Sequence, residues 1–468
     1  MSSQRPSTGI IHLGLGAFFR AFGCIYIADA MSASGGNWGV TGVSLRNSET
    51  RDALRLRDWA YTAVSLDESG EKHRTINVLN DVLVAPEDPV AVLDAMASTS
   101  VRIVSLTVTE KGYCHNPATG QLNPEHPDIR HDLAHALPVS APGFIVRALQ
   151  LRRTAGLPPF TVLTCDNLPE NGKLVRGVVL QLAQWIDADL HDWIAEKGEF
   201  PSTMVDRITP ATTHDDIVRI AAATGQADAA PVVHEPFAQW VVEDKFVEGM
   251  RPDLGAAGVE LVDEVTAYER MKLRMLNGTH SALAYTGYMA GHKTIADTMA
   301  DPVFAVYVRR LWAEIMPAVE APMGVSVLDY SDALFDRYSN SRIRHKTWQI
   351  AMDGSQKLPQ RILDTLRENI QAGRVSPCLC LAVAAWMRYV GGVDESGQPI
   401  DVLDPLADSL QKLVSAADTP GETVSSLLAV EEVFPADLVK PLLEPLSAAA
   451  TRLWAVGTRC AIQEICDE

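Results

Sequence analysis

The chain has 468 residues, which is more than one hydrophobic core usually holds, so we expect two domains. Hydrophobic residues make up 47% of the chain and charged residues 21%, which is ordinary for a water-soluble globular protein. The formal net charge of -19 argues against nucleic acid or an anionic membrane as the main partner, and an anionic small molecule would have to meet a local basic patch.

The cysteines and the amino-terminal residues predict a cytoplasmic protein. The seven cysteines are odd in number and irregularly spaced, which favours reduced thiols over a disulfide framework. No apolar leader core precedes the first expected strand, and no apolar run is long enough to span a bilayer. Both observations favour the cytoplasm.

The first half of the chain alternates between expected strands and helices. Residues 10–15 predict a short buried strand that ends in glycines, 17–34 a helix, and 37–45 the next strand. Strand, glycine turn, helix and strand is how a dinucleotide-binding fold begins. Further strands are expected at 101–108 and 160–165, and further helices at 143–154 and 172–197. This alternation predicts a largely parallel sheet.

The pattern changes near residues 251–264, where proline, glycine and small residues are typical of a domain junction. Beyond it the sequence is mostly helical, for example at 268–289 and 405–417. We therefore predict an α/β, Rossmann-like dinucleotide-binding domain over residues 1–264. A mostly α-helical domain is predicted over residues 265–468.

The turn after the first strand is the first candidate binding site. Gly14 permits a tight turn, and Gly16 lets the backbone approach a pyrophosphate at a helix N-terminus. Phe19 stands where a third glycine is usual, and a lone G-x-G is equally compatible with an ordinary turn. After the next strand, Arg46 stands where an acidic ribose ligand is usual. It would face a 2′-phosphate, stack on adenine or lie exposed in solvent.

Four polar residues fall on one side of the first long helix of the second domain. At about 100° per residue around the helix axis, with Lys272 at zero, Glu269 lies at about 60°, His280 at about 80° and Asn277 at about 140°. Leucines share this wedge, so the polar groups are expected to be buried and to need partners or a chemical role. A satisfied polar network between the domains is the alternative interpretation.

These residue types fit alcohol oxidation without a metal. Burial favours the uncharged form of a lysine, which can then take a proton from an alcohol. Asparagine amides can hold the developing alkoxide, while a dinucleotide accepts the hydride. His131 and His135 are four residues apart, but no H-E-x-x-H motif is present, and their segment is typical of a polar surface. Lone histidines such as His12 and His234 are interpreted as structural.

Three blocks now identify a family. They are H-L-G-L-G-A-F-F-R-A-F from residue 12, K-L-R-M-L-N-G-T-H-S from residue 272, and D-G-S-Q-K-L-P-Q-R-I from residue 353. On these motifs the chain resembles, over nearly its whole length, the long-chain polyol dehydrogenases. This family includes mannitol 2-dehydrogenase, fructuronate reductase (mannonate oxidoreductase), tagaturonate reductase and arabinitol dehydrogenase. The resemblance implies a metal-independent enzyme that uses NAD, with NADP as an alternative, and that is a monomer.

The resemblance also assigns roles to residues. Lys272 is implied as the general base, with Asn277 and His280 completing the site, Glu269 linked to proton exchange with solvent, and Asn167 as the second alkoxide-holding amide. The implied substrate-side residues are Asp206, Glu235 and Gln239. The implied cofactor-side residues are Gly14, Gly16, Phe18, Arg20, Arg46, Thr109, Glu110 and Lys111. One departure is that Phe19 and Phe22 replace two histidines usual in the family's first helix, which affects packing against the cofactor.

Residues 337–361 form a basic island in this acidic chain. Asp353 is their only acidic residue. The basic residues are Arg337, Arg342, Arg344, Lys346, Lys357 and Arg361. We expect Arg344 and Lys357 to bind a sugar-acid carboxylate, although a solvated helix face is the alternative. The motif also resembles the fructuronate reductase branch, which favours D-mannonate/D-fructuronate over D-mannitol/D-fructose. A cofactor-binding regulator without catalysis remains a further alternative.

Overall fold

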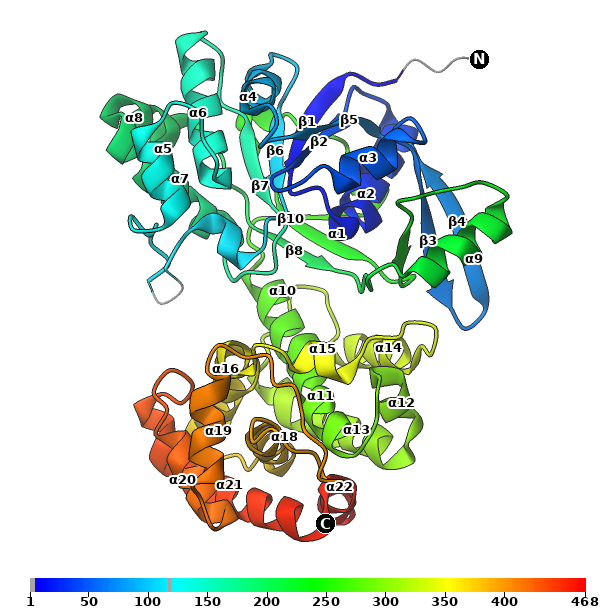
Figure 1. Ribbon diagram of the computed structural model, residues 1–468, viewed down its shortest axis with the longest axis vertical. Coiled ribbons are helices and arrows are strands. Elements are labelled where there is room, and N and C mark those ends of the chain that lie inside the picture. Colours follow the sequence, from blue (N-terminus) through cyan, green and yellow to red (C-terminus); the bar gives the residue numbers. More distant parts are fainter. Residues whose placement is uncertain (1–4, 117–118) are drawn as a thin grey trace. The chain divides into compact units, whose positions relative to one another are not determined.

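The computed structural model describes residues 5–116 and 119–468 and divides the chain into two compact units, 1–266 and 267–468 (Figure 1). The boundary expected from the sequence is residue 264. Both units have their own hydrophobic core, as expected for a chain of this length.

The amino-terminal unit is built on a five-stranded parallel sheet with the order β5-β2-β1-β6-β7. Its strands are β1 Thr8–Leu13, β2 Gly39–Ser44, β5 Leu79–Val84, β6 Ile103–Leu106 and β7 Thr161–Thr164. The chain proceeds from β1 to β2 and β5 on one side, and then to β6 and β7 on the other. This order confirms the predicted Rossmann-like fold, and it creates a topological switch point at the carboxyl ends of β1 and β6.

Two three-stranded sheets complete this unit and were not predicted. Their orders are β4-β3-β9 and β11-β10-β8. The strands are β3 Tyr61–Asp67, β4 Gly70–Ile76, β8 Thr203–Asp206, β9 Val232–His234, β10 Gln239–Glu243 and β11 Glu260–Val262. Four of the six have five residues or fewer, which leaves too little sequence periodicity to distinguish a strand from a loop.

Helices cover both faces of the five-stranded sheet. The cluster that includes α4 to α8 packs on one face, and the cluster that includes α1 and α2 packs on the other. The helices are α1 Ala17–Ala21, α2 Gly23–Ser34, α3 Glu49–Arg55, α4 Pro89–Ala97, α5 Pro127–Ala134, α6 Ala141–Thr154, α7 Asn171–Ile186, α8 Ala188–Lys197 and α9 His214–Thr224. Single-turn helices are η1 Glu110–Tyr113, η2 Val247–Gly249 and η3 Gly255–Ala257.

Two of the helices predicted in the amino-terminal unit are each divided into two. The helix expected at 17–34 breaks at Phe22, whose φ of -129° and ψ of -63° are not helical. The helix expected at 172–197 breaks at Asp187, whose carboxylate instead accepts hydrogen bonds from the Asp189 and Leu190 amides and caps α8. An aspartate at an N-cap stabilises the start of a new helix, so the break has a local cause.

The carboxyl-terminal unit is helical in the part of the chain that the structure describes, which confirms that prediction. Its central helices α11 and α18 are buried along most of their length and pack on each other (Figure 1). The helices are α10 Thr266–Met271, α11 Thr279–Met289, α12 Ile295–Ala300, α13 Pro302–Ile315, α14 Val327–Ser339, α15 Thr347–Ala351, α16 Gly354–Leu358, α17 Asp364–Gln371, α18 Pro377–Tyr389, α19 Ala407–Ser415, α20 Pro420–Leu428, α21 Ala436–Val456 and α22 Thr458–Asp467. Shorter segments are η4 Lys272–Gly278, η5 Met316–Ala318 and η6 Pro359–Leu363.

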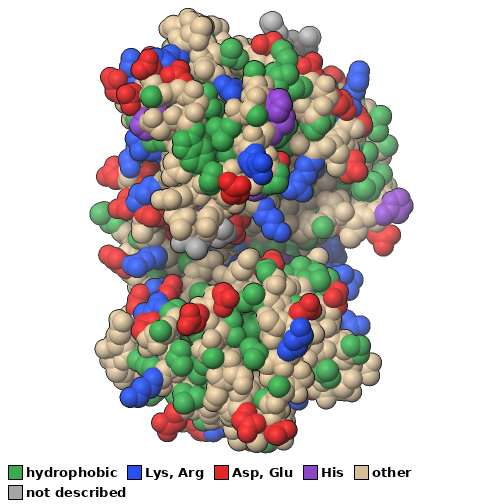
Figure 2. All heavy atoms as spheres, turned by 60° about the vertical axis from the view of Figure 1, so that its left-hand side comes forward, with side chains coloured by type: hydrophobic (Ala, Val, Ile, Leu, Met, Phe, Trp, Pro, Cys, Tyr) green, Lys and Arg blue, Asp and Glu red, His purple; other side chains and the backbone are tan. Residues whose placement is uncertain are grey.

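The surface carries acidic and basic side chains interspersed with apolar ones on the face shown in Figure 2. Within the described residues, no helix combines the length and the apolar character needed to cross a bilayer. The seven cysteines are free thiols, as their odd number and spacing predict.

Candidate active site

The polar helix of the carboxyl-terminal unit is not a continuous α-helix. The segment η4, between α10 and α11, is a π-helix. A π-helix hydrogen-bonds each residue to the one five positions away, and such turns are frequent at functional sites. Lys272 and Asn277 are five residues apart in this segment, so the π turn returns Asn277 towards the side of Lys272. The α-helical spacing of about 140° used for this pair is therefore wrong.

The π segment is held by buried contacts within its own unit. Arg274 lies in its middle, is 5% exposed, and donates a hydrogen bond to the Glu368 carboxylate of α17 at 2.8 Å. Gly278 ends the segment, and a Cβ built on it would lie 2.7 Å from the Arg361 carbonyl oxygen of η6. Two π-helical segments thus meet at a point where only glycine fits.

The three residues predicted for catalysis on this helix are all buried. Lys272 and Asn277 are each 8% exposed, and His280 is 5% exposed. Buried polar groups in such a cluster need partners or a chemical role. Lys272, Asn277 and His280 thus lie along one buried stretch of η4 and α11, with Glu269 one turn earlier on α10, and their catalytic role stays a prediction.

His280 lies in an aromatic and cationic environment. Its ring centroid is 4.7 Å from that of Tyr338 and 5.3 Å from that of His345. Burial, followed by electrostatic repulsion from His345, Arg337, Arg361 and Lys272, holds the pKa of His280 well below its usual value. The ring is therefore neutral at neutral pH, and its buried Nε2 has no hydrogen-bond partner among the described residues.

The basic island at 337–361 does not form one helix. It runs from the end of α14 through an exposed loop to α15, α16 and η6. Arg344 lies exposed in that loop, whereas Arg361 reaches α11 and donates to the Ser281 hydroxyl at 3.1 Å. The alternative of a single solvated helix face is wrong, because the segment is divided and its two ends are largely buried.

Lys357 is one of the partly buried cations of this island. Its Nζ donates to the Met352 carbonyl at 2.6 Å and lies 3.9 Å from the Asp353 carboxylate. Burial, and to a smaller extent the charge of Arg361, lowers the pKa of Lys357 to about 8. Lys357 and Arg361 thus form a cationic pair one turn apart, of which Arg361 contacts α11, and Arg361 was not among the predicted site residues.

The glycine turn of the amino-terminal unit has the predicted shape. Gly14 has a φ of 85°, and a Cβ there would lie 2.3 Å from the Thr107 carbonyl oxygen, so only glycine fits. Gly16 precedes α1, and a Cβ there would meet only the Gly14 carbonyl oxygen at 3.8 Å. The space over Gly16 is free for a ligand to approach the backbone. Phe18 follows it and packs against Phe22 at 4.7 Å.

Phe19 and Gly23 explain the missing third glycine. The Phe19 ring stacks on His12 of β1, with centroids 3.4 Å apart and planes within 8°. A Cβ on Gly23 would lie 2.3 Å from the Phe19 ring, so close packing of helix on strand is achieved by Gly23, four residues later. His12 is fixed by the hydroxyls of Ser105 at 2.8 Å and Thr107 at 2.9 Å, which supports its structural interpretation.

The two arginines assigned to the cofactor differ in exposure. Arg20 is buried, donates to the Ala230 carbonyl and lies 5.3 Å from the Tyr61 ring. These contacts link α1 to the strand elements beneath it and favour a structural role. Arg46 is exposed immediately after β2, at the carboxyl edge of the sheet where a cofactor ribose is usual.

The predicted loop after β6 lies at the same edge. Thr109, Glu110 and Lys111 are exposed, and Thr109 has a strained φ of 63°. The Asp166 carboxylate holds this loop by accepting from the Val108 amide at 2.9 Å and the Thr109 amide at 3.0 Å. Burial is the main reason that the pKa of Asp166 is raised. This positioning residue was missed, although it directly precedes the predicted Asn167.

The remaining predicted residues of this unit lie at strand ends. Asn167 is exposed just after β7, whereas Asp206 is buried at the end of β8. Gln239 of β10 pairs directly opposite Asp206 in the antiparallel ladder. Glu235 is buried and accepts a hydrogen bond from the Ile208 amide at 2.6 Å. The structure thus brings Asp206 and Gln239 together.

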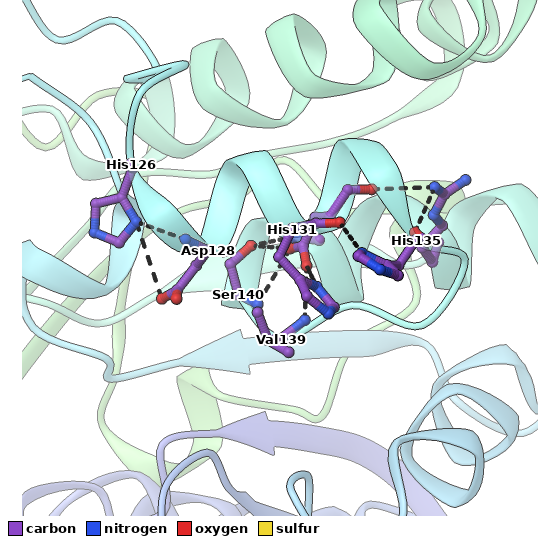
Figure 3. Close-up of polar contacts among 9 residues, drawn as sticks. His126, Asp128, His131, His135, Val139 and Ser140 are labelled. Carbon is purple, nitrogen blue, oxygen red and sulfur yellow. Dashed lines mark hydrogen bonds and ion pairs between the residues drawn. The ribbon is translucent and has the colours of Figure 1, made fainter.

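One group of side chains in the described part of the chain could hold a metal ion. The ligand atoms of Cys114, His126 and Asp128 lie within 4.8 Å of one another. Figure 3 shows that Asp128 instead contacts His126, whose Nδ1 accepts from the Asp128 amide at 3.3 Å. Burial raises the pKa of Cys114 to about 12, so the thiol is uncharged. Neither the alcohol chemistry nor the residues assigned to it involve this group.

The chain is similar to proteins of one family along nearly its whole length. The mannitol dehydrogenase Rossmann domain matches residues 8–255, and the mannitol dehydrogenase C-terminal domain matches residues 264–454. D-Mannonate oxidoreductase of Escherichia coli (strain K12) is 44% identical over 464 residues, which cover 97% of this chain and 95% of that protein.

Two mannitol 2-dehydrogenases are similar to a comparable degree. The enzyme of Phaeosphaeria nodorum is 40% identical over 466 residues, covering 97% of this chain and 81% of that one. The structure of Pseudomonas fluorescens mannitol 2-dehydrogenase, in a ternary complex with NAD and D-mannitol, is 38% identical. It matches with a TM-score of 0.88 and covers 99% of this chain and 95% of that one.

Proposed function

Since the chain belongs to the mannitol dehydrogenase family, whose members oxidise CH–OH groups of polyols and sugar acids or reduce the corresponding ketones, we propose that it interconverts D-mannonate and D-fructuronate with NAD. The observation that carries this choice is the cationic pair of Lys357 and Arg361, of which Arg361 contacts Ser281 of α11. Arginine and lysine recognise carboxylates, which a sugar acid has and a neutral polyol lacks.

The proposed chemistry uses the buried polar groups in distinct roles. The uncharged amine of Lys272 takes the hydroxyl proton as the hydride leaves. The amide of Asn277 donates a hydrogen bond to the developing alkoxide. Neutral His280 offers its Nε2 to a substrate hydroxyl. Glu269, one turn before Lys272, passes the proton to solvent.

The amino-terminal unit fits an NAD-type dinucleotide. The free space over Gly16 admits the pyrophosphate, and the exposed loop of Thr109 to Lys111 lies at the same carboxyl edge. When bound, the nicotinamide accepts the hydride. NAD is preferred to NADP because the similar Pseudomonas fluorescens enzyme was solved with NAD. Arg46 is the residue that would face a 2′-phosphate.

D-Mannitol/D-fructose is the second candidate. It is favoured by the similarity to two mannitol 2-dehydrogenases, at 40% and 38% identity, which is close to the 44% for the mannonate enzyme. Reaction rates with D-mannonate, D-mannitol and other hexonates and pentitols, read from the absorbance of the reduced cofactor, separate the two.

The decisive measurement is kcat/KM for each substrate with NAD and with NADP. We expect the highest value for a sugar acid with NAD. A higher value for D-mannitol would replace the proposed substrate, and no turnover of any of these compounds would favour the non-catalytic regulator.

A further inference from the structure

The amino-terminal unit has a pocket of about 530 Å³ that the proposed chemistry does not use. Its lining includes Leu45 after β2, Ala85 and Pro86 after β5, and Val139 and Phe144 from the start of α6 and the loop before it. β2 and β5 are neighbours in the parallel sheet, so the pocket lies at its carboxyl edge. Ligands of doubly wound sheets bind at this edge.

Two histidines give this apolar pocket its polar groups. His131 and His135 both line it, and their rings stack with centroids 4.2 Å apart and planes within 18°. Figure 3 shows both rings on the same side of α5, close to Val139. Val139 and Leu137 are 45% and 44% exposed, so part of the apolar lining faces solvent.

Hydrogen bonds fix the tautomer of both rings. The Nδ1 of His135 lies 2.9 Å from the His131 carbonyl oxygen, and the Nδ1 of His131 lies 3.2 Å from the Asp132 carboxylate. Carbonyl and carboxylate oxygens only accept, so both Nδ1 atoms carry the proton. In the neutral rings both Nε2 atoms are left as acceptors. Asp132 is itself fixed by the amides of Val139 and Ser140.

We propose that the stacked pair of His131 and His135 reads the base of the dinucleotide, accepting a hydrogen bond at Nε2 from the exocyclic amino group of adenine. This inference rests on the proposed NAD-dependent function and adds the residues that select the base. The apolar walls and the aromatic ring faces suit a flat purine, and stacking of bases on aromatic side chains is strong. The two acceptors suit adenine, whose amino group donates, and oppose hypoxanthine, whose carbonyl oxygen accepts in its place.

The test compares two dinucleotides that differ only at that group. Binding of NAD and of nicotinamide hypoxanthine dinucleotide to the full chain is measured by titration calorimetry. Wild type should bind NAD more tightly by at least about twofold, the lower range for one hydrogen bond. The double variant His131→Phe/His135→Phe keeps aromatic rings and removes the acceptors. In this variant the ratio of the two affinities should fall to about one.

Three controls make the result specific. Nicotinamide mononucleotide lacks adenosine, so its affinity should not differ between wild type and the variant. His214→Phe replaces an exposed histidine at the start of α9, outside the pocket, and should keep the preference. If the double variant unfolds, the single variant His135→Phe takes its place, because that change removes only the hydrogen bond from Nδ1 to the His131 carbonyl oxygen.

An equal preference in wild type and in the phenylalanine variants would overturn the inference and leave the proposed function intact. No preference in wild type would also overturn it. If wild type bound neither NAD nor NADP, the proposed function would fail and this inference with it.

Discussion

Gly278→Ala tests whether the meeting of the two π-helical segments sets the geometry of the active site. The added Cβ would lie 2.7 Å from the Arg361 carbonyl oxygen, which is shorter than real Cβ contacts allow. The neighbour is backbone and cannot rotate away, so η4 and η6 must move apart. Overpacking of this kind costs about 1–3 kcal/mol.

The overpacking in Gly278→Ala should lower both the stability and the catalytic rate. For a unit of this size, that cost lowers the melting temperature by about 2–12 °C. Because η4 carries Lys272 and Asn277, a shift of about 1 Å should lower kcat by about 10- to 100-fold. The dissociation constant of NAD should change little, since the glycine turn belongs to the other unit. Thermal melting by circular dichroism, steady-state kinetics and calorimetry measure the three quantities.

Gly421→Ala is the matched control in the same unit. Gly421 lies in the first turn of α20, and a Cβ there would meet no atom within 4 Å. Alanine is the better helix former, so this change should leave kcat unchanged and raise the melting temperature slightly. Equal kcat and melting temperature for Gly278→Ala and wild type would refute the close approach and the role given to the π segment.

Three further results are expected. Lys272→Ala should lower kcat by at least about 10²-fold with the NAD affinity retained; a loss of only a few-fold, measured by the same absorbance assay, would mean that the polar face is structural. Lys357→Ala should raise KM for a sugar acid more than for the matching polyol. In wild type, KM for the acid should rise as pH passes about 8, because the lysine with its lowered pKa then loses its charge. Parallel pH dependence of KM for acid and polyol would contradict this role. Arg46→Ala should reduce kcat/KM for NADP more than for NAD, and a wild-type enzyme that uses NADP more efficiently would reverse the proposed cofactor preference.

Local sequence determined the order of elements and the types of residue in the site. The alternation of strands and helices, the glycine turn at Gly14 and the polar residues around Lys272 are encoded by periodicity and turn chemistry within short windows. These features predicted the Rossmann-like fold and the helical carboxyl-terminal unit. They also placed the buried group of Lys272, Asn277 and His280, because burial of polar side chains shows as a mixed polar and apolar helix face.

Tertiary packing decided what local sequence leaves open. The π turn at η4 depends on Arg274, which reaches Glu368, and on Gly278, which touches the Arg361 backbone, and these partners are more than eighty residues away in the chain. A helix wheel assumes one hydrogen-bond pattern and cannot include such contacts, so it placed Asn277 too far from Lys272. In the same way, the basic island looks uniform in sequence, but folding leaves Arg344 in solvent and brings Arg361 to Ser281 of α11. Burial is a property of the packed unit and not of the segment.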